Sequence, residues 1–269
     1  MSLADLPLLI EPADLAAHLT DTQLILVDVC QAERFAQGHI PHAQLVTPPQ
    51  TQAQHPPKGY APTAVELEQL FSQLGHHPDA HYVVYDDEGG GWAGRFIWLL
   101  DLIGHKHYHY LNGGWHAWLQ EQREVTTDYQ PRPATETKIQ LTHEPFSVTT
   151  EQLISALEQS NTRIWDARSL AEFSGDKALA QRAGHIPNAI CFEWTKAMDI
   201  NNSLRIRQDM QQVLEQLGFL AEHTVITHCQ THHRSGFTYL VGKIFGLNIK
   251  AYPGSWSEWG NRTDTPIEI

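Results

Sequence analysis

One loop near the C-terminal end of the chain combines the residue types of a nucleophilic site. It consists of Cys229, Gln230, Thr231, His232, His233, Arg234 and Ser235. Unpaired N–H groups at the start of a following helix, the helix dipole and the charge of Arg234 would all favour an anionic sulfur. We therefore predict that Cys229 has a lowered pKa and acts as a nucleophile at neutral pH.

The residues on either side of this loop predict the elements that position it. Val225 and Ile226 form a short apolar run of the kind found in buried strands. After the loop, apolar residues recur at three- and four-residue steps, as on one face of a helix: Phe237, Leu240, Val241, Ile244 and Phe245. The cysteine is thus expected where a strand ends and a helix begins.

The other two cysteines and a possible zinc site are the alternatives to this chemistry. Cys30 and Cys191 lie in apolar runs, where a cysteine is usually buried and unreactive. A zinc ion could use the side chains His228, Cys229, His232 and His233. Four ligands from one short loop do not easily form a tetrahedron, and the sequence has no second ligand cluster, so we expect no metal and no cofactor.

Composition limits the class of partner. The chain has 269 residues, 41% of them hydrophobic, and a formal net charge of −13, which argues against nucleic acid and anionic membranes as partners. Three cysteines give no disulfide framework and suit a reducing compartment. Met1 to Thr20 shows neither a basic segment nor a long apolar one, and no run reaches membrane length, so we expect a cytoplasmic protein.

The chain repeats itself. Helices are predicted near 11–19 and 149–157, the second with a capping box of Thr149 and Gln152. Each is followed by an apolar strand and then by Gly-His-Ile-Pro, beginning at Gly38 and at Gly184. Later pairs are Gly94 with Gly236, Gly104 with Gly246, and 113–118 with 254–259. Alternating strands and helices predict two homologous α/β domains, each a mostly parallel sheet flanked by helices.

The domain boundaries follow from composition. We predict a non-catalytic domain over 1–124, a linker rich in Thr and Pro over 125–138, and a catalytic domain over 139–269. Residues 47–61 are rich in Pro and Gln and are expected to be a partly disordered surface excursion. Aligning Gly94 with Gly236 puts Asp87 at the position of Cys229, and three glycines, 89–91, in place of Thr231 to His233. The chemistry is therefore expected in the second domain alone.

These features together resemble the tandem-domain rhodaneses, which are thiosulfate sulfurtransferases. The resemblance covers essentially the whole chain and is carried by Asp28 and Asp166 at strand ends, the two Gly-His-Ile-Pro motifs, the Gly-x-Trp-x-x-Trp segments and the Cys229 loop. The Cys-Gln-Thr-His-His-Arg-Ser loop is similar to that of a bacterial tandem-domain member. It differs from the vertebrate type, which has a Lys at the position of Thr231 and a substrate-binding Arg where this chain has Glu172.

The resemblance implies a double displacement through a persulfide on Cys229. Arg234 is expected to hold the anionic donor, with His232 and His233 adding charge or hydrogen-bond donors. The remaining loop residues, Gln230, Thr231 and Ser235, would form the surrounding ring of N–H groups, and the family places Trp194 beside the loop. Expected partners are small sulfur anions such as thiosulfate, cyanide or thiol acceptors, and a protein acceptor. We expect a monomer, because two linked domains already supply each other with an interface.

Three other functions fit the same residues. The first is a mercaptopyruvate-type sulfurtransferase, and the second is a phosphatase or arsenate reductase with a Cys–loop–Arg motif. That motif typically has five residues between Cys and Arg, whereas four lie between Cys229 and Arg234, which favours a ring around a single sulfur atom rather than a phosphate. The third is a redox- or sulfide-sensing module that binds partners through the cysteine loop. Measured turnover distinguishes this module from an enzyme.

Overall fold

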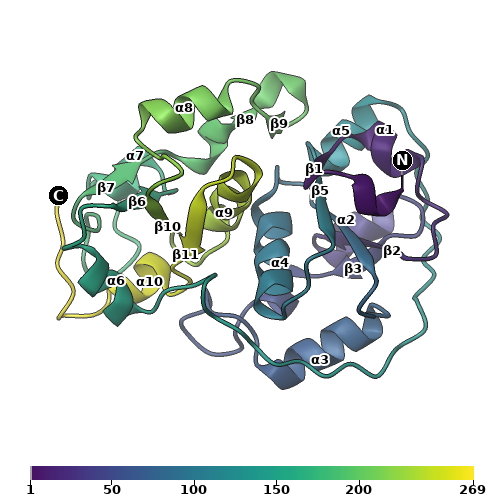
Figure 1. Ribbon diagram of the computed structural model, residues 1–269, viewed down its shortest axis with the longest axis horizontal. Coiled ribbons are helices and arrows are strands. Elements are labelled where there is room, and N and C mark those ends of the chain that lie inside the picture. The colour runs from purple at the N-terminus through teal and green to yellow at the C-terminus, as the bar shows by residue number, and fades with distance from the viewer. Residues whose placement is uncertain (1) are drawn as a thin grey trace.

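The structure, a computed structural model, describes residues 2–269 as two α/β halves joined by a long extended segment (Figure 1). The first half has a five-stranded sheet in the order β1-β5-β4-β2-β3, with every pair parallel. Its strands are β1 (Leu9–Ile10), β2 (Leu24–Val29), β3 (Gln44–Val46), β4 (His81–Tyr85) and β5 (Tyr108–Leu111). Its helices are α1 (Pro12–Ala16), α2 (Ala32–Gln37), α3 (Ala64–Gln73), α4 (Gly91–Leu102) and α5 (Gly114–Gln120), with 3-10 turns at Leu3–Asp5 and Pro48–Thr51.

The second half repeats this plan with a four-stranded parallel sheet in the order β11-β10-β6-β7. Its strands are β6 (Thr162–Asp166), β7 (Ala189–Cys191), β10 (Thr224–His228) and β11 (Asn248–Ala251). Its helices are α6 (Thr150–Ala156), α7 (Leu170–Phe173), α8 (Met210–Gln216), α9 (Arg234–Ile244) and α10 (Ser255–Trp259). A small antiparallel pair, β8 (Met198–Asp199) and β9 (Arg205–Ile206), lies beside 3-10 turns at Trp194–Ala197 and Ile200–Asn202. The predicted fold class is confirmed.

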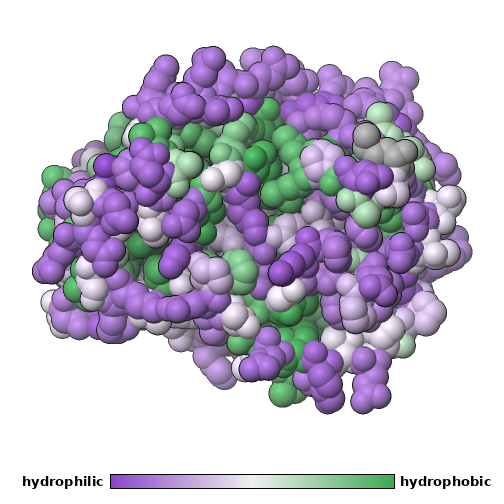
Figure 2. All heavy atoms as spheres, viewed as in Figure 1, coloured by the Kyte–Doolittle hydropathy of each residue, from purple (hydrophilic) through white to green (hydrophobic). Residues whose placement is uncertain are grey.

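Three apolar clusters hold these layers together. One covers the outer face of the first sheet with α1, α2 and α5, and a second covers the outer face of the other sheet with α6 and α10. The third and largest lies between the sheets and draws side chains from α3, α4, α8 and α9. Hydrophobic residues reach the surface at the upper centre of Figure 2, over the junction of the two halves. The two halves therefore share one hydrophobic core and pack as a single unit.

Helices α4 and α9 form the contact between the halves. Gly94 and Gly236, the glycines paired by the sequence repeat, meet at the crossing: a Cβ on Gly94 would lie 2.3 Å from the carbonyl oxygen of Gly236. Two residues without side chains allow the backbones to touch. Helix α4 is buried along almost its whole length because it packs on its own sheet and on α9. That burial explains its nearly uniform apolar sequence.

The start of α6 has the capping box that the sequence predicted. Thr149 accepts the N–H of Gln152, and Gln152 accepts the N–H of Thr149, which is the predicted capping box. Between α5 and α6, residues 121–149 contain no helix or multi-residue strand in the described structure, and the proposed linker 125–138 lies within this interval. The linker is attached to the first half through Arg132, which donates to the carbonyl oxygen of Leu24 at 2.8 Å.

The expectation that residues 47–61 form a surface excursion holds only in part. Residues 54–56 are exposed, but Thr51 is fully buried and the segment lies against the second half. Gly59 approaches Pro253 so closely that a Cβ there would lie 1.8 Å from the Pro253 oxygen, and the Tyr60 hydroxyl donates to Glu258 at 2.8 Å. Its polar composition resembles that of a free loop because its own backbone carbonyl groups make most of the contacts, by accepting from the Arg95 side chain, and because Glu258, the acceptor of the Tyr60 hydroxyl, lies far along the chain. Among residues 2–269, no helix is long and apolar enough to span a bilayer.

Candidate active site around Cys229

Cys229 directly follows β10, the strand that pairs with β6 on one side and β11 on the other. Because all these strands are parallel, their carboxyl ends lie at one edge of the sheet, where sites in open α/β sheets form. Residues 229–233 turn from that edge into the first turn of α9, as the sequence predicted. The cysteine is only 1% exposed, so its sulfur lies at the bottom of the loop.

The surroundings of the sulfur favour the thiolate. Burial disfavours a charged sulfur, but the Arg234 guanidinium and hydrogen bonds from Ser235 and from the backbone of Thr231 outweigh it and lower the pKa of Cys229. The Ser235 hydroxyl lies 3.5 Å from the sulfur. This direction agrees with the prediction made from the loop sequence. Such a thiolate, in a ring of N–H groups at a helix start, is suited to nucleophilic attack.

The other two cysteines have the opposite character. Burial raises the pKa of Cys30, which is fully buried, and raises that of Cys191 to about 11. Both thiols therefore remain protonated at neutral pH and are poor nucleophiles. This finding agrees with the structural role that their apolar surroundings indicated.

Arg234 is paired with Glu172 rather than free. Its two terminal nitrogens donate to the carboxylate oxygens of Glu172, on α7, at 2.6 and 2.8 Å. Burial opposes the charge of Glu172, yet Arg234 and the cap residue Ser169 lower its pKa to about 2. The net charge that Arg234 presents to the sulfur is thus reduced, and Glu172 places a carboxylate at the edge of the site.

The two neighbouring histidines lie in different environments. His232 has a φ of 55° and is fully buried, with its Nδ1 2.8 Å from the Ser235 hydroxyl. Burial, together with the nearby charge of Arg95, lowers its pKa well below the usual range, so the ring is neutral. A neutral Nδ1–H can donate to Ser235, whose hydroxyl then points to the Cys229 sulfur. His232 therefore acts behind the loop and not in open contact with solvent.

His233 faces the first half. Its ring stacks on Trp92 of α4 with 4.0 Å between centroids, and its Nε2 lies 3.0 Å from a Glu88 carboxylate oxygen. Trp194 also lies beside this ring, with 5.6 Å between the ring centroids. Residues from both halves therefore surround this part of the loop.

The rest of the loop is braced by backbone contacts. The side chain of Gln230 turns away to donate to the carbonyl of Leu179 at 3.1 Å. The carbonyl oxygens of Cys229 and Gln230 accept the N–H groups of Trp256 and Ser257 at 2.9 and 3.0 Å. The Gly-x-Trp-x-x-Trp segment at α10 thus fixes the floor of the loop. His228, the fourth residue of the zinc interpretation, points instead toward Asp166, at 3.6 Å, so these four side chains diverge.

The equivalent loop of the first half is closed by its own carboxylate. Asp86, fully buried, accepts the N–H groups of Glu88, Gly90, Trp92 and Ala93 at 2.8–3.1 Å. The carboxylate that fills this ring is Asp86 and not Asp87, which the ungapped alignment placed opposite Cys229. Asp87 points toward Arg34, at 3.6 Å. The ring of N–H groups in the first half is thus already occupied and cannot hold a substrate sulfur.

Sequence reasoning missed Arg95. This residue of α4 is fully buried and donates to the carbonyl oxygens of Thr231 and His232 in the Cys229 loop. One sequence signal was available, since Arg95 is a single charge within the apolar run from Trp92 to Leu100. A charge in such a run needs buried partners, and here the partners belong to the other half of the chain.

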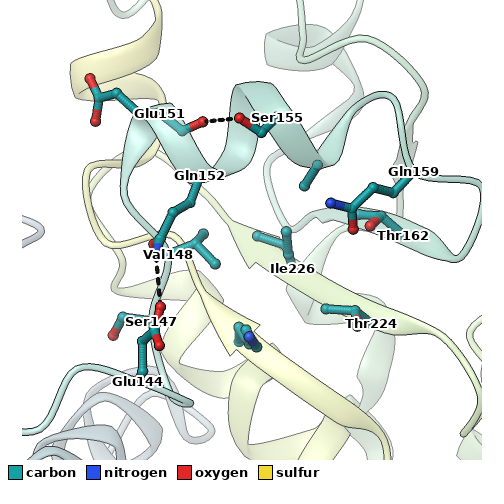
Figure 3. A pocket seen from close by; sticks show the side chains of 12 residues that line it. Glu144, Ser147, Val148, Glu151, Gln152, Ser155, Gln159, Thr162, Thr224 and Ile226 are labelled. Carbon is teal, nitrogen blue, oxygen red and sulfur yellow. Dashed lines mark hydrogen bonds between the residues drawn. The ribbon is translucent and has the colours of Figure 1, made fainter.

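A separate hollow of about 430 Å³ lies between α6 and the sheet of the second half (Figure 3). Thr162 and Thr224, the first residues of β6 and β10, contribute to its wall. Its polar lining includes a hydrogen bond from Gln152 to Glu144 at 2.8 Å. Because Cys229 follows the opposite end of β10, this hollow is distinct from the thiol site.

Comparison with known proteins agrees with this arrangement. A model of the rhodanese-like domain matches residues 11–121 and 149–262. A thiosulfate sulfurtransferase of Pseudomonas aeruginosa is 55% identical over 268 residues, 99% of this chain and 98% of the relative. One from Azotobacter vinelandii is 53% identical with the same coverage. The structure of a 3-mercaptopyruvate sulfotransferase of Escherichia coli shares the fold, with a TM-score of 0.80 at 22% identity over 94% of this chain and 100% of that one.

Proposed function

We propose that this chain, which belongs to the rhodanese family, is a sulfurtransferase that moves the outer sulfur of thiosulfate to cyanide or a thiol. The Cys229 thiolate attacks the outer sulfur, the sulfur–sulfur bond of the donor breaks, and sulfite leaves with the electron pair. The enzyme then carries a persulfide. Cyanide or a thiolate attacks its terminal sulfur, takes that atom and restores the Cys229 thiolate, which gives ping-pong kinetics.

The observation that carries this proposal is the lowered pKa of a buried cysteine inside a ring of N–H donors. The same donors would stabilise the terminal anionic sulfur of a persulfide, because backbone N–H groups directed at one point form an anion site. The high identity to two thiosulfate sulfurtransferases over nearly the whole chain supports thiosulfate as donor.

The roles of the other loop residues follow from their places. Arg234 attracts the donor anion, while its pairing with Glu172 limits how strongly the anion is held. Ser235 donates to the sulfur and is held in place by His232. His233 and Trp194 form part of the wall facing the first half. Gln230 and Thr231 contribute through their backbone. We further propose that the chain works as a monomer in the cytoplasm, since its halves already bury a shared core.

Intact-protein mass after incubation with thiosulfate tests this function. The wild-type chain and Cys191→Ala should each gain one sulfur atom, which cyanide removes, whereas Cys229→Ala should gain none. Cys191→Ala is the matched control because it removes a thiol that stays protonated at neutral pH. Absence of any adduct would refute thiosulfate as donor. Mercaptopyruvate and an aryl phosphate, applied in the same assay, would then test the two other enzyme classes.

A further inference from the structure

Arg95 is a buried cation that belongs to one half of the molecule and binds the catalytic loop of the other. It follows Gly94 on α4, and the close crossing of α4 and α9 brings it to the Cys229 loop: a Cβ on Gly236 would lie 2.7 Å from the Arg95 nitrogen. Its side chain is fully buried. The position of the guanidinium is therefore set by packing between the halves.

The guanidinium donates to five carbonyl oxygens. Two belong to the Cys229 loop, those of His232 at 3.2 Å and Thr231 at 3.4 Å. Three belong to the segment 47–61 of the first half, those of Thr51, Gly59 and Tyr60 at 2.7–2.9 Å. A planar fork with several donors suits such a set of acceptors, and a lysine could not satisfy it. Arg95 thus links the catalytic loop to the segment that encloses it.

None of these acceptors neutralises the charge. All five are uncharged peptide groups, and within residues 2–269 the anion that offsets the burial of Arg95 is the Cys229 sulfur. Burial lowers the pKa of Arg95 to about 9, so it remains protonated at neutral pH. A buried cation without a carboxylate is costly unless an anion lies nearby. The thiolate and the persulfide of Cys229 are such anions.

We propose that Arg95 is a positioning residue for sulfur transfer: it fixes the carbonyl groups of the Cys229 loop and balances the negative charge of the Cys229 sulfur from the other half of the chain. The first half, whose own loop is closed by Asp86, would thus contribute to catalysis without binding substrate. This inference builds on the sulfur transfer proposed above, but its electrostatic part concerns the free enzyme.

Other charged and titratable groups lie in or around the Cys229 loop and are present in every variant tested. They are Arg234 on α9, His228 at the end of β10, His232 and His233 in the loop, Glu172 on α7, Asp166 at the end of β6 and Arg168 just after it. Changing Arg95 leaves all of them in place. A shift in the titration of Cys229 is then attributable to Arg95 itself or to a displaced loop.

The test is the pH titration of the thiolate ultraviolet absorbance, with the matching Cys229→Ala protein subtracted, for wild type, Arg95→Met and Arg95→Lys. Lys243→Met is the control, because Lys243 on α9 pairs with Asp101 on α4 at 2.6 Å and so crosses the same interface away from the sulfur. We expect Arg95→Met to raise the pKa of Cys229 by about one unit or more. Lys243→Met should lower the melting temperature without that shift.

Turnover with thiosulfate gives the second readout. Arg95→Lys keeps the charge but loses the fork, so we expect a smaller pKa shift and a fall in kcat of roughly tenfold that Lys243→Met does not show. If Arg95→Met does not fold, the Lys variant decides. The proposal would be refuted if the Arg95 variants kept the wild-type pKa of Cys229 and the wild-type kcat while losing as much melting temperature as Lys243→Met. Arg95 would then be a packing residue only. Because the titration uses no sulfur donor, it remains informative even if thiosulfate is not the substrate.

Discussion

Gly94 and Gly236 touch where α4 crosses α9, and each occupies the same place in its half of the repeat. The contact lets the two helices approach until backbone meets backbone, and it places the start of α4 beside the start of α9. Trp92, Arg95 and the Cys229 loop meet because of it. The duplicated architecture thus brings the half whose loop is occupied by Asp86 into direct contact with the half that carries Cys229.

Gly94→Ala should destabilise the protein although alanine favours helices. In an isolated helix this change adds about 1 kcal/mol of stability. Here the new Cβ would lie 2.3 Å from the Gly236 oxygen, so the helices must separate, and overpacking of this kind costs about 1–3 kcal/mol. Urea unfolding measures the change, and kcat should fall with it because Arg95 moves. A gain in stability would show that the crossing is loose.

Cys229 should titrate below the ordinary thiol value of 9.0, and Ser235→Ala should raise its pKa. The Ser235 hydroxyl donates to the sulfur at 3.5 Å, and this bond favours the charged form. Thiolate absorbance as a function of pH, with the Cys229→Ala protein as blank, gives both values. Because the charged form is the nucleophile, transfer activity should fall as pH drops through this pKa. An unchanged titration in Ser235→Ala would exclude the hydroxyl as a donor to the thiolate.

Glu172→Gln should weaken stability and strengthen donor binding. The carboxyl pKa is about 2 in the folded protein and 4.5 when unperturbed, so the pair with Arg234 stabilises the fold fully above about pH 4.5. That contribution, roughly 2–3 kcal/mol, is lost as pH falls toward 2. The difference from wild type in urea unfolding should therefore shrink from pH 7 to pH 3. Glu158→Gln, at an exposed position, is the control.

The same variant tests the role of Arg234 in binding. Removing the carboxylate leaves the guanidinium with a larger net charge toward a dianionic donor, so KM for thiosulfate should fall by several fold. An increase in KM would indicate that Glu172 serves mainly to orient Arg234. In that case the carboxylate would help to position Arg234 for binding and would not weaken the attraction between Arg234 and the donor.

Asp86→Ala should destabilise the first half strongly. Four N–H groups lose their acceptor, and each unsatisfied buried donor costs about 1–3 kcal/mol, so a loss of at least about 3 kcal/mol is expected in urea unfolding. Asp87→Ala is the matched control, since Asp87 makes one longer ion pair and should cost about 0.5 kcal/mol. Equal losses of stability in the two variants would contradict the conclusion that the Asp86 carboxylate fills the ring of N–H groups in the first half.

Much of the site was predictable because it is local in sequence. The strand, the loop and the helix around Cys229 follow from periodicity and from residue types within about twenty positions, and so does the capping box at Thr149. The duplication predicted the fold and a carboxylate in the first loop, although the alignment named Asp87 where the structure has Asp86. It also paired Gly94 with Gly236, although not their contact. The direction of the Cys229 pKa followed from the helix start and from Arg234, its neighbours in sequence.

Other features depended on which faces meet. His232 and His233 are identical in type and adjacent, yet a φ of 55° at His232 turns one ring into the core and leaves the other against Trp92. The packing of segment 47–61 on the second half was not predicted, because it depends on backbone carbonyl groups that accept from Arg95 and on Glu258, a residue far along the chain.

The sequence by itself determined a duplicated α/β chain with a cysteine in a cationic loop that favours its thiolate, because those properties depend on neighbouring residues. Only the tertiary structure decided which charges reach the sulfur. Glu172 pairs with Arg234 across 62 positions, and Arg95 reaches the loop across 137. Such pairings depend on how two sheets and two crossing helices pack, and packing is a property of the folded surfaces rather than of any local pattern.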